Sequence, residues 1–285
     1  MMSIFQEKTT RTPRMILNRQ IAATCAAWLT IAACGSVANS QPQELLPPAS
    51  TTAPQAVPVI TVETIKPTAV SAPTQAARVQ VPAPGSGQAV VAYSQGELEV
   101  FPSPASPGQG KLLPATTILG TPQVYLVEGL PSSGWVRLAL PGRPNGSTGW
   151  ALASDLEFEI VDQAIKVDLS DRTLALIENG VEVMLAPVAV GSAVNPTPTG
   201  QFYVTDIVQL ADPGSAWGPF ALGISARSDT ITEFNGGDGI IGIHGTNRPA
   251  TIGEAVSLGC IRLDNQLITQ LVALVGLGTP VEISD

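Results

Sequence analysis

Two short segments decide how this chain is interpreted: Ile243-His244-Gly245-Thr246 and, ten residues further on, Ser257-Leu258-Gly259-Cys260-Ile261-Arg262-Leu263. His244 is the only histidine in the sequence, and Cys260 is one of three cysteines. A thiol needs a nearby base to react near neutral pH, because its unperturbed pKa is about 8.5, and histidine is the usual base. The two segments therefore suggest a catalytic Cys–His pair. A buried thiol and an unrelated imidazole are the alternative.

Glycines adjoin both residues of this pair. Gly245 follows His244, and Gly259 precedes Cys260. Glycine adopts backbone angles that are closed to other residues and leaves its amide uncovered. This combination is typical of a tight loop that faces a substrate, and it favours the catalytic alternative.

His-Gly-Thr-Asn followed by Ser-x-Gly-Cys-Ile-Arg-Leu resembles the signature of the L,D-transpeptidases, the YkuD-type enzymes of the bacterial cell wall. The resemblance covers residues 160–283. It implies an acyl-enzyme at Cys260, with His244 moving the proton. Members of the family usually carry a second histidine where this chain has Leu258, so the rate or the substrate preference is open to question.

Main-chain groups around the pair are candidates for supporting roles. The amides of Leu258, Gly259 and Cys260 are the candidate oxyanion hole, the set of donors that stabilises a tetrahedral intermediate. No acidic residue adjoins His244. We therefore expect a main-chain carbonyl to orient its ring, and Gly245 is the nearest in sequence.

Side chains that could contact the substrate are Arg262, Ser257, Tyr203 and Trp217. Arg262 would hold the loop or meet a carboxylate, with a structural salt bridge as the alternative. Ser257 would bond within its turn. Trp217 lies in a segment that resembles the one lining the family's substrate cleft. Tyr203 is a second candidate for the cleft, and packing in the core is the alternative for both aromatic residues.

The reaction that the resemblance implies is a transfer between peptidoglycan stem peptides. Cys260 would attack the carbonyl after the L-centre of residue three in a donor tetrapeptide, and an acceptor stem would complete a 3-3 cross-link, a step in wall assembly and cell shape. An L,D-carboxypeptidase, which passes the acyl group to water, is one alternative. The other is a wall-binding lipoprotein whose catalytic domain has decayed, which Leu258 suggests.

The composition favours a β-rich protein and argues against a partner nucleic acid and against a metal site. The 285-residue chain is 44% hydrophobic but only 5% aromatic, with 27 glycines and 25 prolines, which favours β-rich structure and linkers over helical bundles. The formal charge is −9, and because residues 1–33 carry +3, the remainder carries −12. Such an acidic body argues against nucleic acid as a partner. With one histidine, a zinc site would need carboxylates, so we expect neither metal nor cofactor.

Residues 1–33 are predicted to be an export signal. A basic region precedes an apolar run, which is shorter than the ~20 residues that cross a bilayer. Ile31-Ala32-Ala33-Cys34-Gly35 resembles a bacterial lipobox, which implies cleavage and lipidation at Cys34. Ordinary cleavage and an uncleaved anchor are the alternatives. We therefore expect an exported protein at the outer face of the cytoplasmic membrane or in the cell wall, held to the membrane by a lipid at Cys34.

Two segments separate this signal from the catalytic motif. Residues 34–86 begin with Cys34 and are then rich in Pro, Ala and Thr without an amphipathic period, which predicts a disordered linker. Residues 87–157 alternate short apolar strands with turn clusters. They include a predicted hairpin that carries Trp135 and Trp150. This segment is similar to bacterial SH3-like modules, which are small β-barrels.

Residues 160–285 are predicted to form the catalytic domain. The resemblance implies a YkuD-like β-sandwich or mixed β domain with one short helix after Cys260. Local sequence patterns also favour strands followed by one helix. Asn179-Gly180 between two apolar runs indicates a hairpin. Asp264 can cap a helix whose apolar residues recur at helical spacing as far as Val275.

Overall fold

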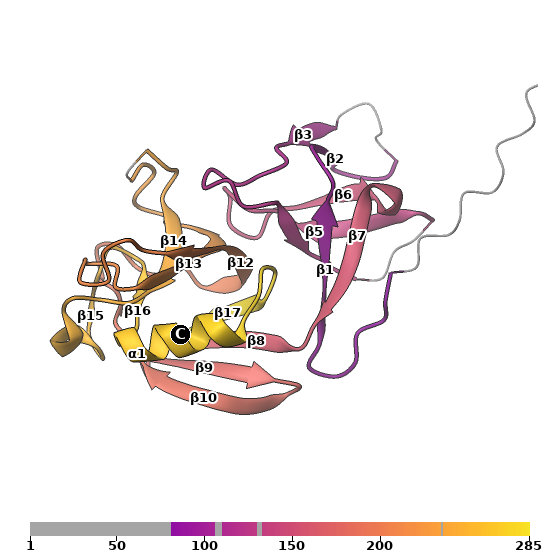
Figure 1. Ribbon diagram of the computed structural model, residues 1–285. Helices are drawn as coiled ribbons and strands as arrows, with labels where there is room; N and C mark the ends of the chain where they lie inside the picture. The colour runs from indigo at the N-terminus through magenta and orange to yellow at the C-terminus, as the bar shows by residue number, and fades with distance from the viewer. Residues whose placement is uncertain (1–80, 106–109, 130–132, 235) are drawn as a thin grey trace, which may run out of the picture. The chain divides into compact units, whose positions relative to one another are not determined.

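The computed structural model describes residues 81–105, 110–129, 133–234 and 236–285 (Figure 1). The predicted export signal, Cys34 and nearly all of the predicted linker lie outside the described residues. Strands predominate in the described part, and one α-helix follows Cys260, so the mainly-β class is confirmed. No helix within these ranges has the length and apolarity needed to cross a bilayer.

Short antiparallel strands make up the first part of the described chain. They are β1 (Ala89–Ser94), β2 (Leu98–Val100), β3 (Lys111–Leu113), β4 (Val124–Leu126), β5 (Trp135–Ala139), β6 (Thr148–Leu152) and β7 (Leu156–Val161), with a 3-10 turn, η1 (Ala153–Asp155), before β7. They pair as β4-β1-β7, β2-β3 and β5-β6. The predicted hairpin that carries Trp135 and Trp150 is β5–β6, in which Arg137 lies opposite Trp150.

Alternation of buried and exposed residues explains these strands. In β5 the side chains of Val136 and Leu138 are fully buried and the residue between them is exposed, as expected for a strand with one face on a core. β1 pairs with β7 as far as Val161, so the strand continues beyond the predicted end of the module at residue 157. The SH3-like assignment of this part stays a prediction.

An eight-stranded mixed sheet forms the rest of the structure. Its strands are β8 (Gln163–Asp168), β9 (Thr173–Glu178), β10 (Val181–Pro187), β12 (Gly200–Gln209), β13 (Phe220–Arg227), β14 (Ile240–His244), β16 (Ile261–Arg262) and β17 (Pro280–Ser284). The order is β10-β9-β8-β17-β12-β13-β14-β16. Two of its pairings, β17 with β8 and β14 with β16, are parallel. A short parallel pair, β11 (Val190–Gly191) with β15 (Ala255–Ser257), and a 3-10 turn, η2 (Pro249–Thr251), complete it.

The predicted hairpin at Asn179-Gly180 is confirmed as the β9–β10 turn. Both residues have positive φ, 50° and 80°, as a two-residue turn requires when it follows the right-handed twist of its strands. The turn places β10 at one edge of the sheet.

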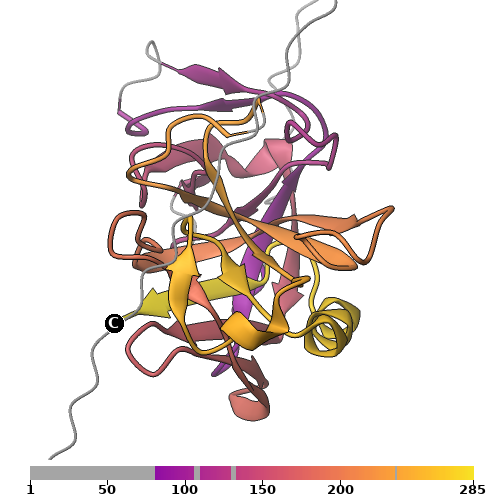
Figure 2. The same ribbon diagram turned by 90° about the vertical axis from the view of Figure 1, so that its left-hand side faces the viewer.

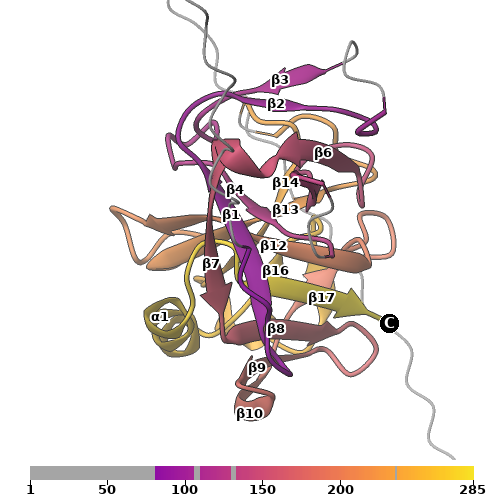
Figure 3. The same ribbon diagram turned by 90° about the vertical axis from the view of Figure 1, so that its right-hand side faces the viewer.

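The predicted helix is α1 (Asn265–Leu274), and the Asp264 side chain accepts a hydrogen bond from the Gln266 amide at 2.8 Å. This bond satisfies one of the amides that a helix start leaves without a partner. Ile268 and Leu271 are buried on the face that packs toward β13 and β14. Figures 2 and 3 show α1 end-on, to one side of the strands. Its burial holds the segment after Cys260 against the strands that carry the site.

Candidate active site

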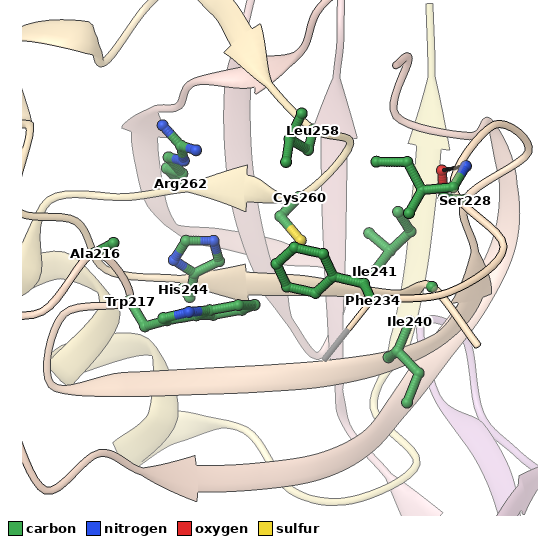
Figure 4. Close-up of a pocket in the computed structure, with 12 residues that line it drawn as sticks. Ala216, Trp217, Ser228, Phe234, Ile240, Ile241, His244, Leu258, Cys260 and Arg262 are labelled. Carbon is green, nitrogen blue, oxygen red and sulfur yellow. Dashed lines mark hydrogen bonds between the residues drawn. The ribbon is translucent and has the colours of Figure 1, made fainter. Parts of the chain in front are cut away.

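Two neighbouring parallel strands bring Cys260 and His244 together. β14 ends at His244, and Cys260 stands directly before β16, with Ile243 opposite Ile261 and His244 opposite Arg262. This register puts Cys260 beside Gly242, whose amide lies 3.4 Å from Sγ. Gly242 and His244 are two residues apart in one strand and so face the same side of the sheet, which brings the thiol and the imidazole to the same region. Both line one pocket, and Figure 4 shows them pointing into the same space.

Ser257 holds the turn before Cys260 in shape. Its hydroxyl donates to the Cys260 carbonyl at 2.5 Å and accepts from the Gly259 amide at 3.0 Å. Gly259 has a φ of 116°, and a Cβ there would stand 3.1 Å from Ile241 Cδ1. A left-handed backbone and a close neighbour together require glycine at this position.

Thr197 ties the same turn to a distant part of the chain. Its hydroxyl donates to the Gly259 carbonyl and accepts from the Gly191 amide, each at 2.8 Å. The side chain is buried, with 4% of its surface exposed. Both bonds are therefore shielded from water, and their loss would leave buried polar groups unpaired.

The His244 ring is held by its own main chain and by an aromatic neighbour. Nδ1 lies 2.6 Å from the Gly245 carbonyl, the group expected from the sequence. A carbonyl oxygen only accepts, so Nδ1 carries the proton and Nε2 has the free lone pair. The Trp217 ring packs against the imidazole, with 4.4 Å between ring centres. The arrangement presents a neutral base to the pocket.

Gly245 is also the site of a close contact between two main chains. A Cβ at Gly245 would stand 3.0 Å from Gly218 Cα and would collide with Asn265 Oδ1. Asn265 Oδ1 accepts from the Thr246 amide at 2.7 Å. The first residue of α1 therefore anchors the segment that follows His244.

Burial sets the protonation of both groups. Desolvation lowers the pKa of His244 from 6.5 to about 4, assisted by the positive charge of Arg262 and opposed by hydrogen bonding to the main chain at Gly245 and Trp217. Desolvation also raises the pKa of the Cys260 thiol, against the opposing effects of the Gly242 amide, 3.4 Å from Sγ, and of Arg262. At neutral pH the resting site is therefore a thiol beside a neutral imidazole.

The pocket is mainly apolar. Side chains that line it include Trp217, Ile231, Phe234, Ile240, Ile241 and Leu258. Leu258 is 51% exposed, and it occupies the place of the family's second histidine. Apolar walls strengthen electrostatic interactions inside the pocket because they lower the local dielectric.

Arg262 is the one formally charged residue among the described residues that line the pocket. No carboxylate of the described chain forms an ion pair with it, so the alternative of a structural salt bridge is absent there. Its Nε is buried and has no hydrogen-bond partner within the same part of the chain. Within the described residues the charge of the guanidinium therefore has no acidic counterpart.

Two sequence expectations need correction. Tyr203 does not line the pocket: its side chain is fully buried, and its hydroxyl donates to the Ala139 carbonyl at 3.2 Å. β12 turns this side chain toward the N-terminal strands, where it packs with Val91 and Val124.

The second correction concerns the candidate oxyanion hole. The Gly259 amide donates to the Ser257 hydroxyl and so is not a free oxyanion donor. Among the described residues, the amides of Leu258 and Cys260 have no hydrogen-bond acceptor.

Several residues that shape the site were missed from the sequence. Thr197 and Asn265 support the segments that carry Cys260 and His244 through side-chain bonds, and Ile231 and Phe234 line the pocket. Thr197 begins a Thr-Pro-x-Gly pattern, which is typical of a turn but does not indicate the segment that the turn contacts. Nothing in the sequence placed Phe234 near Cys260.

The fold and the site together define a β-sheet domain with a cysteine and a histidine at one pocket. A family model described as the L,D-transpeptidase catalytic domain, YkuD, matches residues 162–283. The chain is 38% identical over 120 residues to the YkuD protein of Bacillus subtilis, which covers 42% of this chain and 65% of that protein. It is 36% identical over 126 residues to the YkuD protein of Bacillus licheniformis, covering 44% of this chain and 68% of the relative. The chain thus spans about two thirds of these curated relatives, and it belongs to the YkuD family of L,D-transpeptidases.

Solved structures with a related fold include an L,D-transpeptidase of Enterococcus faecium, 22% identical, with a TM-score of 0.35 over 44% of this chain and 50% of that one. One from Mycobacterium tuberculosis is 15% identical, with a TM-score of 0.38 over 57% of this chain and 90% of that one. Likeness at this level adds nothing to the sequence match on the site or the substrate.

Proposed function

We propose that this protein is a peptidoglycan L,D-transpeptidase that forms 3-3 cross-links through an acyl-enzyme at Cys260, with His244 as acid and base. The observation that carries the proposal is that the paired ends of β14 and β16 place both side chains in one pocket. Membership of the family supports the class of reaction.

The first step begins from a neutral pair. Nε2 of His244 takes the thiol proton as Sγ of Cys260 bonds to the carbonyl carbon after residue three of a donor tetrapeptide stem. Proton transfer accompanies the attack, because the lowered pKa of His244 and the raised pKa of Cys260 both disfavour a resting ion pair. The free amides of Leu258 and Cys260 are the candidate donors to the oxyanion. Because these donors are main-chain groups, the leucine side chain at position 258 does not remove them.

The intermediate then collapses. The bond between the carbonyl carbon and the terminal D-residue breaks, His244 gives its proton to the leaving amine, and a thioester to Cys260 remains. The amine of an acceptor stem attacks the thioester, His244 takes the amine proton, and the thiol is restored. If water attacks the thioester instead, the same steps make the protein an L,D-carboxypeptidase, and the shape of the pocket decides between the two acceptors.

Arg262 is proposed to bind a carboxylate of the stem. It supplies the positive charge in an otherwise apolar pocket and has no acidic partner within the described chain. A guanidinium binds a carboxylate through two parallel hydrogen bonds, which gives orientation as well as affinity.

Export and anchoring through Cys34 are proposed on the sequence alone. Metabolic labelling with a clickable fatty acid should mark the wild-type chain in a bacterial host and should leave a Cys34→Ser variant unmarked. Equal labelling of both would remove the proposal.

The test of the reaction is incubation of the purified protein with a disaccharide tetrapeptide and analysis of the products. A 3-3 linked dimer supports transpeptidation, release of tripeptide alone supports a carboxypeptidase, and the absence of turnover supports a decayed domain. Cys260→Ala should abolish turnover and carbapenem labelling while the fold persists. A carbapenem adduct on the Cys260→Ala protein would refute the assignment of the nucleophile.

A further inference from the structure

The wall of the pocket opposite Arg262 belongs to the connection between β13 and β14. This segment, residues 228–234 and 236–239, supplies Ser228, Ile231 and Phe234 to the lining. Figure 4 shows Ser228 on the opposite side of Cys260 from Arg262. The amide of Ser228 donates to the Gly239 carbonyl at 2.8 Å, a bond that joins the first and last residues of the segment.

The turn between β5 and β6 contacts the two ends of this segment, at Ser228 and Asp238. Arg143 donates through Nη1 to the Asp238 carbonyl at 2.5 Å, and through Nη2 to the carbonyls of Ser228 at 2.6 Å and Ile231 at 2.9 Å. One guanidinium therefore joins three carbonyls from both arms of the segment. Hydrogen bonds from a charged donor are stronger than neutral ones, and the planar fork fixes their relative directions.

Asn145 supports the same contact in a second way. Its Oδ1 accepts from the Arg227 amide and its Nδ2 donates to the Arg227 carbonyl, both at 2.8 Å. The side-chain amide thus pairs with the end of β13 as another strand would, because it offers one donor and one acceptor at the spacing of a peptide group.

We propose that the β5–β6 turn is a positioning device for the active site, with Arg143 and Asn145 holding the wall that carries Ile231 and Phe234 against Cys260. The inference rests on the proposed function, because the wall acts on a substrate in the Cys260 pocket. Neither residue touches the catalytic pair, so the device governs how the donor stem is held and leaves the chemistry to Cys260 and His244.

Arg143→Ala tests this in the full-length chain, with Arg137→Ala as the matched control. Arg137 lies in the same hairpin but bonds to Thr148 and pairs with Glu128, away from the pocket. Loss of the three Arg143 hydrogen bonds should raise KM for the tetrapeptide about tenfold, with kcat nearly unchanged, because these bonds hold the wall against which the substrate is positioned. Arg143→Lys, which keeps the charge without the fork, should recover part of this loss, and the control should behave as wild type.

Amide hydrogen exchange gives a readout that does not need turnover. Peptides covering residues 228–234 should exchange faster in Arg143→Ala and Asn145→Ala than in Arg137→Ala, while peptides covering α1 remain unchanged. Alkylation of Cys260 by iodoacetamide, measured in a Cys25→Ser, Cys34→Ser background, should keep its wild-type rate.

Unchanged KM and unchanged exchange in Arg143→Ala would overturn the proposal, and so would a loss confined to kcat. If the wild-type protein forms neither dimer nor tripeptide, the proposed function fails. The exchange experiment then still decides whether the turn holds the wall.

Discussion

The lowered pKa of His244 makes the free energy of unfolding depend on pH. The ring is 4% exposed and has its pKa lowered to about 4, chiefly by burial. Between pH 4 and pH 6.5 the unfolded chain binds a proton that the folded chain does not. The free energy of unfolding therefore rises with pH across this window, and the contribution is fully present above pH 6.5 and lost as the pH falls to 4.

We expect this effect to reach about 3 kcal/mol, given 1.36 kcal/mol for each pKa unit. Urea unfolding of the wild type and of His244→Asn at several pH values isolates it, because the carboxylates titrate in both proteins. The stability difference between the two should shrink as the pH falls from 6.5 to 4. A constant difference would contradict the assignment, as would a midpoint near 6.5 for the single histidine in an NMR titration.

Arg262 offers a second test at the residue scale. If its guanidinium binds a stem carboxylate, Arg262→Ala should raise KM by about tenfold or more, and Arg262→Lys should recover part of the loss, since one charge-assisted hydrogen bond is worth roughly 1.5–3 kcal/mol. Steady-state kinetics with a tetrapeptide and with its C-terminal amide separates the causes. The KM values of the two substrates should differ for the wild type and should become similar for Arg262→Ala. If the difference persists in the variant, another group binds the carboxylate.

At the scale of elements, the turn that carries Cys260 depends on its bonds to the segment before β12. Thr197→Val keeps the shape of the side chain but removes both of its hydrogen bonds, so the Gly191 amide and the Gly259 carbonyl lose their partner. We expect a loss of about 2 kcal/mol in the free energy of unfolding and slower acylation of Cys260.

Thr199→Val is the matched control, because Thr199 stands two residues away and is exposed. Denaturant unfolding and stopped-flow acylation by a carbapenem measure the two effects. Equal behaviour of the two variants would show that Thr197 does not support the turn.

The elements that were predicted from the sequence are those with a local signal. Asn179-Gly180 demands positive φ at two positions, and Asp264 caps α1 within its own segment. The bond from Thr197 to Gly259 joins residues 62 positions apart, and no local pattern encodes that pairing. Cys260 and His244 were found because the motif itself is specific, whereas the residues that support them depend on how the strands are ordered.

Across the whole of residues 81–285, Tyr203 shows how contacts join the N-terminal strands to the large sheet. Its fully buried ring packs with Val91 and Val124, and Gly278 approaches the same two valines so closely that a Cβ there would stand within 3.0 Å of Val124 Cγ2. An aromatic residue in a strand is equally compatible with a cleft and with a core, and only the packing of distant strands decides between them. That is why the sequence alone could not decide between the cleft and the core for Tyr203.

Removing this ring should weaken the whole described structure. Tyr203→Ala should lower the free energy of unfolding by about 4 kcal/mol through loss of burial and the cavity left behind. Tyr203→Phe, which loses only the bond to the Ala139 carbonyl, should cost about 1 kcal/mol. Urea unfolding followed by tryptophan fluorescence measures both, and a cost below 1 kcal/mol for the alanine variant would contradict the packing.

Asn265 has a consequence for any attempt to alter this protein. Its side chain accepts from the Thr246 amide and fills the space beside Gly245 and Gly218, so it joins the start of α1 to the segment after the histidine. A graft that exchanges the helix for another of equal length would carry the base out of alignment unless asparagine is retained at its first position. The position of His244 therefore depends on the start of the helix as well as on its own strand.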